Sequence, residues 1–463
     1  QNSRLCQAAH VALPGQNSRL CQAAHVALPA DALCDRGFGC DPGPMPATNP
    51  DEAFRSPTLP GVQISQGCTE PAAVALCAAL AARAVGGEVE AVTLVCDRNT
   101  LKNAHAVQIP GGGGARGARF AAALGASGGD PARGLAALAE LPAGALEQAR
   151  ALIAADAVVL EVADTDRARL WIEARVNTTR GEGRARLEDS HSRVTLLEAA
   201  GAPATLPSWA SAEAGQSDPR WEGAGLADVV ASAERTNTAE LARYLEGLEL
   251  NLAAARHGTS YAAATACEEL ATRAELLAAA GSEARMGGLE VAVMTSGFSG
   301  NQGFVATLPV WVVAESLGAE REELGRALAL SHLVGSYVRA STGVLSPLCN
   351  AVHAASAGAA AACARLLGGD LRAMEQAAQL ALATAAGTLC DGAKLGCSLK
   401  TGLGAGQAVR CAQRAVAGAT LPAAGIAGPT LGDTARNLAR LAHPALQAAD
   451  ELLLRTTLEG TES

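Results

Sequence analysis

Residues 67–95 read GCTEPAAVALCAALAARAVGGEVEAVTLV, and this stretch decides the fold class. Residues 71–85 are predicted to form a helix, because proline is tolerated in a first turn and the glycines at 86 and 87 can end the helix. Residues 89–95 then show the alternating pattern of a β-strand. A helix that leads directly into a strand predicts a domain containing both α and β structure.

The segments that follow extend this domain and then change character. A sharp turn within 106–114 precedes the start of a helix at 120–124. Four short segments are predicted as strands of an antiparallel or mixed sheet, at 157–163, 168–176, 184–188 and 192–198. After a polar link near 203–220, the pattern is almost all helical from about 226 to 454. The sequence therefore predicts a mixed α and β (α+β) fold, with a small sheet domain at 60–215 and a larger, mainly helical domain at 216–459.

Composition excludes several classes of protein. Of the 463 residues, 49% are hydrophobic, 18% are charged and only 3% are aromatic, which indicates a globular chain whose core is built from small aliphatic side chains. The net charge is −10 and no block of Lys or Arg is visible, so we expect neither a nucleic-acid nor a membrane partner. Residues 340–364 are nearly uncharged, but they are interrupted by Pro347 and are predicted as a buried helix pair.

The first 59 residues differ from the rest. The segment QNSRLCQAAHVALP occurs at 1–14 and again at 16–29, and two short copies cannot form a repeat fold. We expect residues 1–59 to be an extension outside the core, or an artefactual addition. The chain has thirteen cysteines but does not start with a basic segment and an apolar run, so we expect a reducing compartment and a cytoplasmic protein.

Two motifs suggest where a substrate binds. Cys68 directly precedes the first predicted helix, and a helix N-terminus lowers the pKa of a thiol, so Cys68 is a candidate base, nucleophile or metal ligand. The loop SGFSGNQG at 296–303 contains small residues that let a ligand approach the backbone. Its Asn301 and Gln302 offer amide donors suited to a carboxylate.

A second pair of motifs is rich in cysteine. The segment LSPLCN at 345–350 carries Cys349, and CDGAKLGCSLK at 390–400 carries Cys390 and Cys397. A set of cysteines without histidine suits iron–sulfur ligation better than a catalytic zinc ion. Only three lysines occur among the 36 basic residues, and two of them, Lys394 and Lys400, lie in this second motif. The third, Lys102, lies in another polar turn, and this placement favours a functional role for all three.

From about residue 60 to the last helix, the chain resembles the L-cysteine desulfidase family, which is related to the α part of the iron–sulfur L-serine dehydratases. The resemblance rests on the order and wide spread of short motifs, namely GCTEP at 67–71, KNAHAVQIPG at 102–111, AAALGA at 121–126, SGNQG at 299–303, SHLV at 331–334, LSPLC at 345–349 and CDGAKLGCSLK at 390–400. One departure is Asn350, which stands where the family pattern has glycine.

The resemblance implies an enzyme with a 4Fe-4S cluster and no pyridoxal phosphate. It implies that Cys349, Cys390 and Cys397 hold three irons, and that the fourth iron is open to substrate. L-Cysteine would then undergo β-elimination to pyruvate, ammonia and sulfide. Cys68 corresponds to the family's remaining motif cysteine, as a base or a displaceable ligand.

The remaining candidates are donors that would polarise the substrate. Lys394 is a candidate catalytic residue, and the candidate substrate-binding residues are Ser299, Asn301, Gln302 and Lys102. Their polar groups could stabilise the charge that develops when the Cα proton leaves. We expect a small amino acid as the partner, and association into a homo-oligomer is left open.

Several alternatives stay open at this point. The nearest is an L-serine dehydratase with the same type of cluster. A non-catalytic iron–sulfur redox sensor would need the cysteines but not the SGNQG loop, and a pyridoxal enzyme would use Lys394 without a visible phosphate site. Individual residues also have purely structural interpretations: Lys394 as an ion-pair partner of Asp391, Glu70 as a helix-start charge, His332 as a buried histidine, and His105 and His191 as structural or surface residues.

Overall fold

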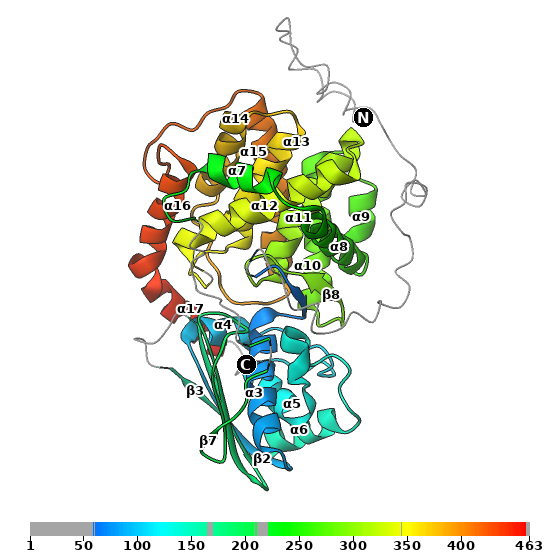
Figure 1. The fold of residues 1–463 in the computed structure, drawn as a ribbon, viewed down its shortest axis with the longest axis vertical. Helices are drawn as coiled ribbons and strands as arrows, with labels where there is room; N and C mark the ends of the chain where they lie inside the picture. The colour runs from blue at the N-terminus through cyan, green and yellow to red at the C-terminus, as the bar shows by residue number, and fades with distance from the viewer. Residues whose placement is uncertain are drawn as a thin grey trace, which may run out of the picture.

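The computed structural model describes residue 59 and residues 61–163, 170–207, 209–210, 221–343 and 345–459. The predicted extension at 1–59 lies outside the described residues, apart from Leu59. Figure 1 shows a sheet with its covering helices at one end of the molecule and a larger helical body at the other. The predicted α+β fold class is confirmed.

The main sheet has six strands in the order β3-β2-β4-β5-β6-β7. Strands β2 and β3 pair in parallel and the other pairs are antiparallel, so the sheet is mixed, as the sequence predicts. The strands are β2 (Val89–Cys96), β3 (Val158–Val162), β4 (Trp171–Thr178), β5 (Gly181–Glu188), β6 (Val194–Ala199) and β7 (Ala202–Pro203). All five strand segments predicted from the sequence are therefore found.

Helices cover one face of this sheet (Figure 1). They are α3 (Thr69–Val85), α5 (Ala118–Gly128) and α6 (Ala145–Ala154), with a 3-10 turn at Pro131–Ala136. Small residues let these layers approach closely. A Cβ atom on Gly183 of β5 would lie 2.0 Å from the backbone oxygen of Ala81 in α3. A Cβ atom on Gly125 of α5 would lie 2.2 Å from the backbone oxygen of Ala75 in α3. The small residues of this core therefore bring the helices into close contact, as predicted.

Helix α4 (Arg98–His105) stands at the end of the sheet that faces the helical body. Asp97, directly after β2, caps this helix, because its side chain accepts hydrogen bonds from the backbone of Asn99 and Thr100, both at 2.9 Å. The cap fixes where α4 begins and therefore where Lys102 and Asn103 lie.

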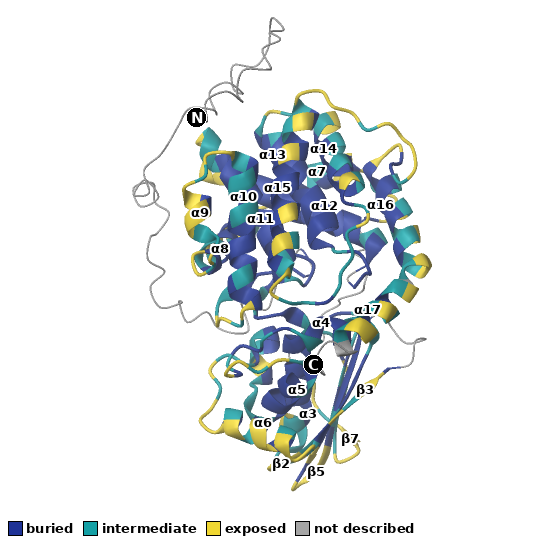
Figure 2. Cartoon of the chain, turned by 180° about the vertical axis from the view of Figure 1, so that it is seen from behind, coloured by how far each residue is buried: buried dark blue, intermediate teal, exposed yellow. Residues whose placement is uncertain are grey.

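The second body is almost entirely helical, as predicted. Its alanine-rich central helices are buried over most of their length (Figure 2). The helices are α7 (Leu226–Glu234), α8 (Thr238–Ala255), α9 (Tyr261–Thr265), α10 (Leu270–Met286), α11 (Gly300–Leu317), α12 (Arg321–Thr342), α13 (Ser356–Leu366), α14 (Leu371–Thr384), α15 (Cys397–Val416), α16 (Leu431–Arg440) and α17 (Gln447–Glu459), with π-helical turns at Ala351–Ala355 and Leu441–Ala445.

The predicted buried helix pair at 340–364 is found only in part: α12 ends at Thr342, and after the loop around residues 345–350 the π-helical turn at Ala351–Ala355 leads into α13, which packs in the helical core. Among the described residues, no helix combines the length and the apolar character that crossing a membrane requires.

The two ends of the described chain cross between the two bodies. Near the start, Leu59 and Val62 belong to the helical core, and β1 (Ile64–Gln66) pairs with β8 (Ala292–Met294). At the other end, Leu454 of α17 belongs to the core of the sheet domain. The division into domains at 60–215 and 216–459 stays a prediction.

Candidate active site

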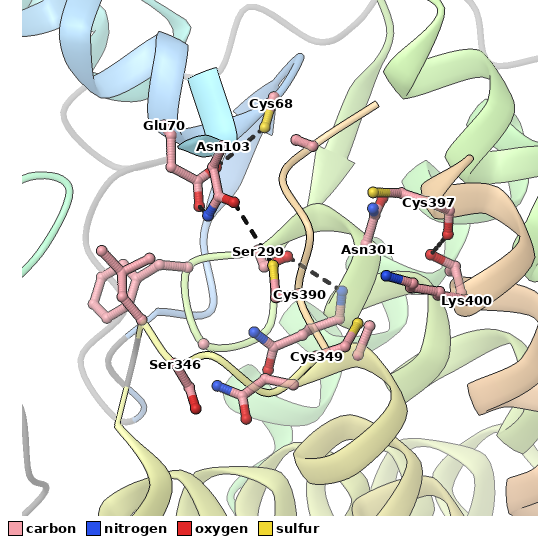
Figure 3. Close-up of a pocket in the computed structure, with 18 of the residues that line it drawn as sticks. Cys68, Glu70, Asn103, Ser299, Asn301, Ser346, Cys349, Cys390, Cys397 and Lys400 are labelled. Carbon is pink, nitrogen blue, oxygen red and sulfur yellow. Dashed lines mark hydrogen bonds between the residues drawn. The ribbon is translucent and has the colours of Figure 1, made fainter. Parts of the chain in front are cut away.

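A cavity of about 100 Å³ lies where the two bodies meet (Figure 3). The sheet domain contributes the start of α3, the last turn of α4 and the turn between β5 and β6. The helical body contributes the start of α11 and the loops around residues 345–351 and 390–401. Segments that are far apart in the sequence therefore form one site.

Cys349, Cys390 and Cys397 all line this cavity. Two loops are joined by backbone hydrogen bonds that place the first two cysteines together: the Cys349 amide donates to Thr388 at 3.0 Å, and the Cys390 amide donates to Pro347 at 2.7 Å. Cys397 is the first residue of α15, so it lies at the positive end of a 20-residue helix. The backbone thus gathers the three cysteines that the sequence singles out.

The three cysteines are free of disulfide bonds. Burial, together with the neighbouring Cys390 and Cys397, raises the pKa of Cys349 to about 12. Burial also raises the pKa of Cys397, with a contribution from Cys390. Three thiolates in this space would repel one another, so a cationic centre is needed to hold them in that form.

The candidate donor set in the cavity consists of the sulfurs of Cys349, Cys390 and Cys397. An iron–sulfur cluster is held by cysteine thiolates, each bound to a different iron. Three soft sulfur donors around one cavity, one of them at a helix N-terminus, therefore fit an iron–sulfur cluster.

The SGNQG loop lies at the start of α11. Ser299 caps this helix by accepting a hydrogen bond from the Gln302 amide. Arg285 donates to Asn301 Oδ1 at 3.0 Å, and Arg339 donates to Gln302 Oε1 at 3.1 Å. A guanidinium group can only donate, so both amide oxygens are committed to arginine. The amide nitrogens of Asn301 and Gln302 remain as donors in residues that line the cavity.

Arg285 and Arg339 place positive charge behind the loop. Both are buried, and neither forms an ion pair with a carboxylate among the contacts of the described residues. Burial lowers the pKa of Arg339 to about 10, which leaves it charged at neutral pH. A buried uncompensated charge is unfavourable, so this wall of the cavity favours an anionic ligand such as a substrate carboxylate.

Cys68 differs from the expectation of a thiol with a lowered pKa. Its Sγ donates to Glu70 Oε2 at 3.1 Å. Burial, together with the negative charge of Glu70, raises the pKa of Cys68 well above its usual range. Desolvation and an adjacent carboxylate therefore outweigh the helix N-terminus, and the expected low pKa is wrong for the metal-free site. The role of Cys68 as a base or ligand stays a prediction.

Glu70 is more than a helix-start charge. Asn103 donates to its Oε1 at 3.0 Å, and the Cys390 thiol in turn approaches Asn103 Oδ1 at 3.6 Å. Burial alone would raise the pKa of Glu70, but contacts with His191 and the Cys68 thiol outweigh it and lower the pKa to about 2. Glu70 is thus a largely buried carboxylate, with its side chain 13% exposed, that connects Cys68 with Asn103.

The three lysines have different surroundings. Lys394 Nζ lies 2.5 Å from Asp391 Oδ2, is 40% exposed and does not line the cavity, which agrees with its interpretation as an ion-pair partner. Lys400 also pairs with Asp391 and does line the cavity. Lys102 is buried against Asp450 at 2.6 Å, outside the cavity lining. Its neighbour Asn103 occupies the lining instead.

Several cavity residues were not among the predicted site residues, namely Glu70, Asn103, His191, Arg285 and Lys400. The sequence could have indicated two of these residues. Asn103 follows Lys102 in the motif at 102–111, and Lys400 lies about one helical turn after Cys397. His191 lies in a turn between strands and belongs to no motif, so the sequence alone does not point to it.

Residues 210–455, more than half of the 463-residue chain, match the serine dehydratase alpha chain family. The chain belongs to this family. The matched region contains the SGNQG loop and the three cysteines at 349, 390 and 397.

Relatives of this chain extend the similarity to the sheet domain. A UPF0597 protein from Desulfotalea psychrophila is 32% identical over 417 residues, which is 85% of this chain and 95% of the relative. A UPF0597 protein from Nitratidesulfovibrio vulgaris (strain DP4) is 36% identical over 438 residues, 87% of this chain and 97% of the relative. Membership in the family indicates a lyase-type enzyme and suggests an iron–sulfur cofactor. The finer resemblance to L-cysteine desulfidases is not decided by these names.

Proposed function

We propose that this serine dehydratase-like protein is a 4Fe-4S-dependent lyase that removes the β substituent of a small L-amino acid. L-Cysteine is the first expected substrate, with pyruvate, ammonia and sulfide as products, and L-serine is the alternative. One observation carries the proposal: the cavity brings Cys349, Cys390 and Cys397 together with the SGNQG loop. The family match independently favours the same reaction type.

Cys349, Cys390 and Cys397 would hold the cluster, which when bound would supply a Lewis acid for the departing sulfide or hydroxide. The chain's own groups would bind the rest of the substrate. The amide nitrogens of Asn301 and Gln302 are placed to donate to its carboxylate. The buried charges of Arg285 and Arg339 behind them favour that carboxylate over a neutral group.

The difficult step is the removal of the Cα proton, because this proton is weakly acidic and no pyridoxal group is expected to withdraw its electrons. Donors that grip the carboxylate more strongly as charge develops on it would lower that barrier. The substrate must also be small, because the cavity has a volume of only about 100 Å³. L-Cysteine and L-serine are both small enough to meet this requirement.

The test is anaerobic purification followed by iron and acid-labile sulfide analysis. Sulfide release from L-cysteine and pyruvate release from L-serine are then measured on the same sample. About four irons per chain with oxygen-sensitive turnover would support the proposal, and the faster substrate would decide between the two leaving groups. A protein that takes up no iron on anaerobic reconstitution would refute the cluster.

Matched variants make the test specific to the site. Cys390→Ala should lose the cluster and all turnover. Cys267→Ala, which removes a cysteine outside the cavity lining, should keep both. Asn301→Ala should keep iron and lose turnover in a lyase. A redox sensor would instead tolerate this change, and a pyridoxal enzyme would keep its cofactor absorbance after iron removal.

A further inference from the structure

His191 lines the cavity from the sheet-domain side, in the turn between β5 and β6. It is only 2% exposed, yet neither of its ring nitrogens makes a hydrogen bond within the described residues. Buried polar groups in native proteins are nearly always hydrogen-bonded. A buried imidazole in a cavity wall with two unused nitrogens therefore points to a ligand or a reacting proton.

Packing rather than hydrogen bonding fixes the His191 ring. It packs against Phe298 with ring centroids 5.9 Å apart and an interplanar angle of 38°. Phe298 lies in the SGFSGNQG loop and adopts a left-handed φ of 63°, which is unusual for a residue other than glycine. The loop that carries Asn301 and Gln302 thus also positions this imidazole.

Glu70 is a charged group close to His191, and Asp189 and Arg193 of the same turn pair with each other. His191 Nε2 lies 3.8 Å from Glu70 Oε1, within ion-pair distance when the ring is protonated. The carboxylate is held in place by the Cys68 thiol and the Asn103 amide. Arg285 donates a hydrogen bond to Thr69 Oγ1 at 3.1 Å, so its positive charge also lies on this side of the cavity. A fixed carboxylate beside an imidazole stabilises its charged form, as a base requires once it has taken up a proton.

We propose that His191 is the catalytic residue that carries the substrate proton, with Glu70 as its positioning and charge-stabilising partner. This inference rests on the proposed function. The neutral ring first accepts the Cα proton reversibly, which leaves the electrons of the Cα–H bond on the substrate. These electrons then form the Cα=Cβ double bond as the Cβ substituent leaves with its bonding pair. The imidazolium then returns the proton to the departing hydrosulfide or hydroxide, so His191 ends the cycle neutral.

The assignment of His191 as the base is consistent with a protonated thiol at Cys68. The Cys68 thiol donates a hydrogen bond to Glu70 and keeps its proton, so it is a poor acceptor for the Cα proton. His191 has no such competing donor or acceptor within hydrogen-bond distance. Cys68 then helps to hold Glu70 in position, while the proton moves between substrate and imidazole.

The experiment compares His191→Asn and Glu70→Gln with the wild-type protein, each loaded with iron under anaerobic conditions. His257→Ala is the matched control, because this histidine is exposed and lies outside the cavity lining. The measurements are iron content, kcat and KM across pH, and exchange of the Cα proton of L-serine or L-cysteine with D2O.

We expect His191→Asn to keep its iron, to lose at least about a hundredfold in kcat and to lose Cα exchange, with little change in KM. Glu70→Gln should retain part of the activity and shift the acidic limb of the pH profile. Full activity of His191→Asn with an unchanged profile would overturn the proposal. Loss of iron in that variant would overturn it as well, because His191 would then support the site structurally.

A second measurement separates this inference from the proposed function. Nitrogen-15 NMR of the histidines in the metal-free protein reads the ring nitrogens of His191 directly, with the signals assigned from His191→Asn. We expect Glu70→Gln to move the His191 nitrogen signals relative to the wild-type protein, because it replaces the carboxylate that lies 3.8 Å from Nε2; identical spectra would overturn the pairing. If loaded wild-type protein releases neither pyruvate nor sulfide, the proposed function fails, and the catalytic role of His191 fails with it even if the pairing is observed.

Discussion

Lys102→Met tests whether the buried lysine of α4 is structural or binds substrate. The Lys102 and Asp450 side chains are 1% and 8% exposed, and their charged atoms lie 2.6 Å apart. Methionine keeps most of the apolar stem but leaves the carboxylate of Asp450 buried without its partner. Breaking a buried ion pair in this way costs about 3–5 kcal/mol of folding free energy. We expect a loss of that size, together with weaker docking of α17 on α4.

Guanidinium unfolding of the metal-free protein measures this loss, and a double-mutant cycle with Asp450→Asn isolates the pair. The double variant should recover about 2 kcal/mol or more of the single-variant loss, because neither charge is then left alone. Arg455→Met is the control on the same helix: its pair with Glu451 is 66% and 42% exposed and should matter by less than about 1 kcal/mol. A Lys102→Met protein of wild-type stability with a raised KM would refute this reasoning and restore Lys102 as a substrate ligand.

Three further outcomes are expected. Cys68→Ala should keep its iron, read by absorbance and iron analysis, but lose turnover; loss of iron would instead make Cys68 a ligand. Burial lowers the pKa of His332 to about 3, so the unfolded chain takes up a proton near pH 6.5 while the folded chain does not. Stability therefore falls as the pH drops, and His332→Phe should remove about 2 kcal/mol of the loss between pH 6.5 and 5 in unfolding experiments. Gly303→Ala should cost about 1–3 kcal/mol by the same assay, because its Cβ would lie 1.9 Å from a backbone oxygen of β8; a neutral result would show that α11 can shift.

The fold was accessible from the sequence because its signals are local. The turn glycines after α3, the alternation in β2 and the later strand segments each specify an element through neighbouring residues. The crossing of the chain ends was not accessible. Nothing near Leu59 shows that it packs with helices beginning more than 160 residues later, since that depends on which surfaces meet.

The residues of the candidate site also fall into two groups, those that the sequence could indicate and those that only the folded structure brings together. Cys349, Cys390 and Cys397 could be singled out because cysteine spacing is a sequence property, and they share a cavity. The sequence could not show which of the lysines lines the cavity. Lys394 precedes α15 and turns to Asp391, whereas Lys400, inside the helix, lines the cavity one turn after Cys397. His191 was passed over because its significance depends on Glu70 and Phe298, which come from two other parts of the chain.

The crossing of the chain ends also constrains how the protein can be made. Residues 61–207 are translated before the helical body, but Lys102 gains its counter-charge only when Asp450 has been synthesised. Until then Lys102 lacks its partner, and the core of the sheet domain lacks Leu454. The sheet domain is therefore completed only after the helical body has been translated, and cutting the chain between the two bodies would leave each half without residues from its own core.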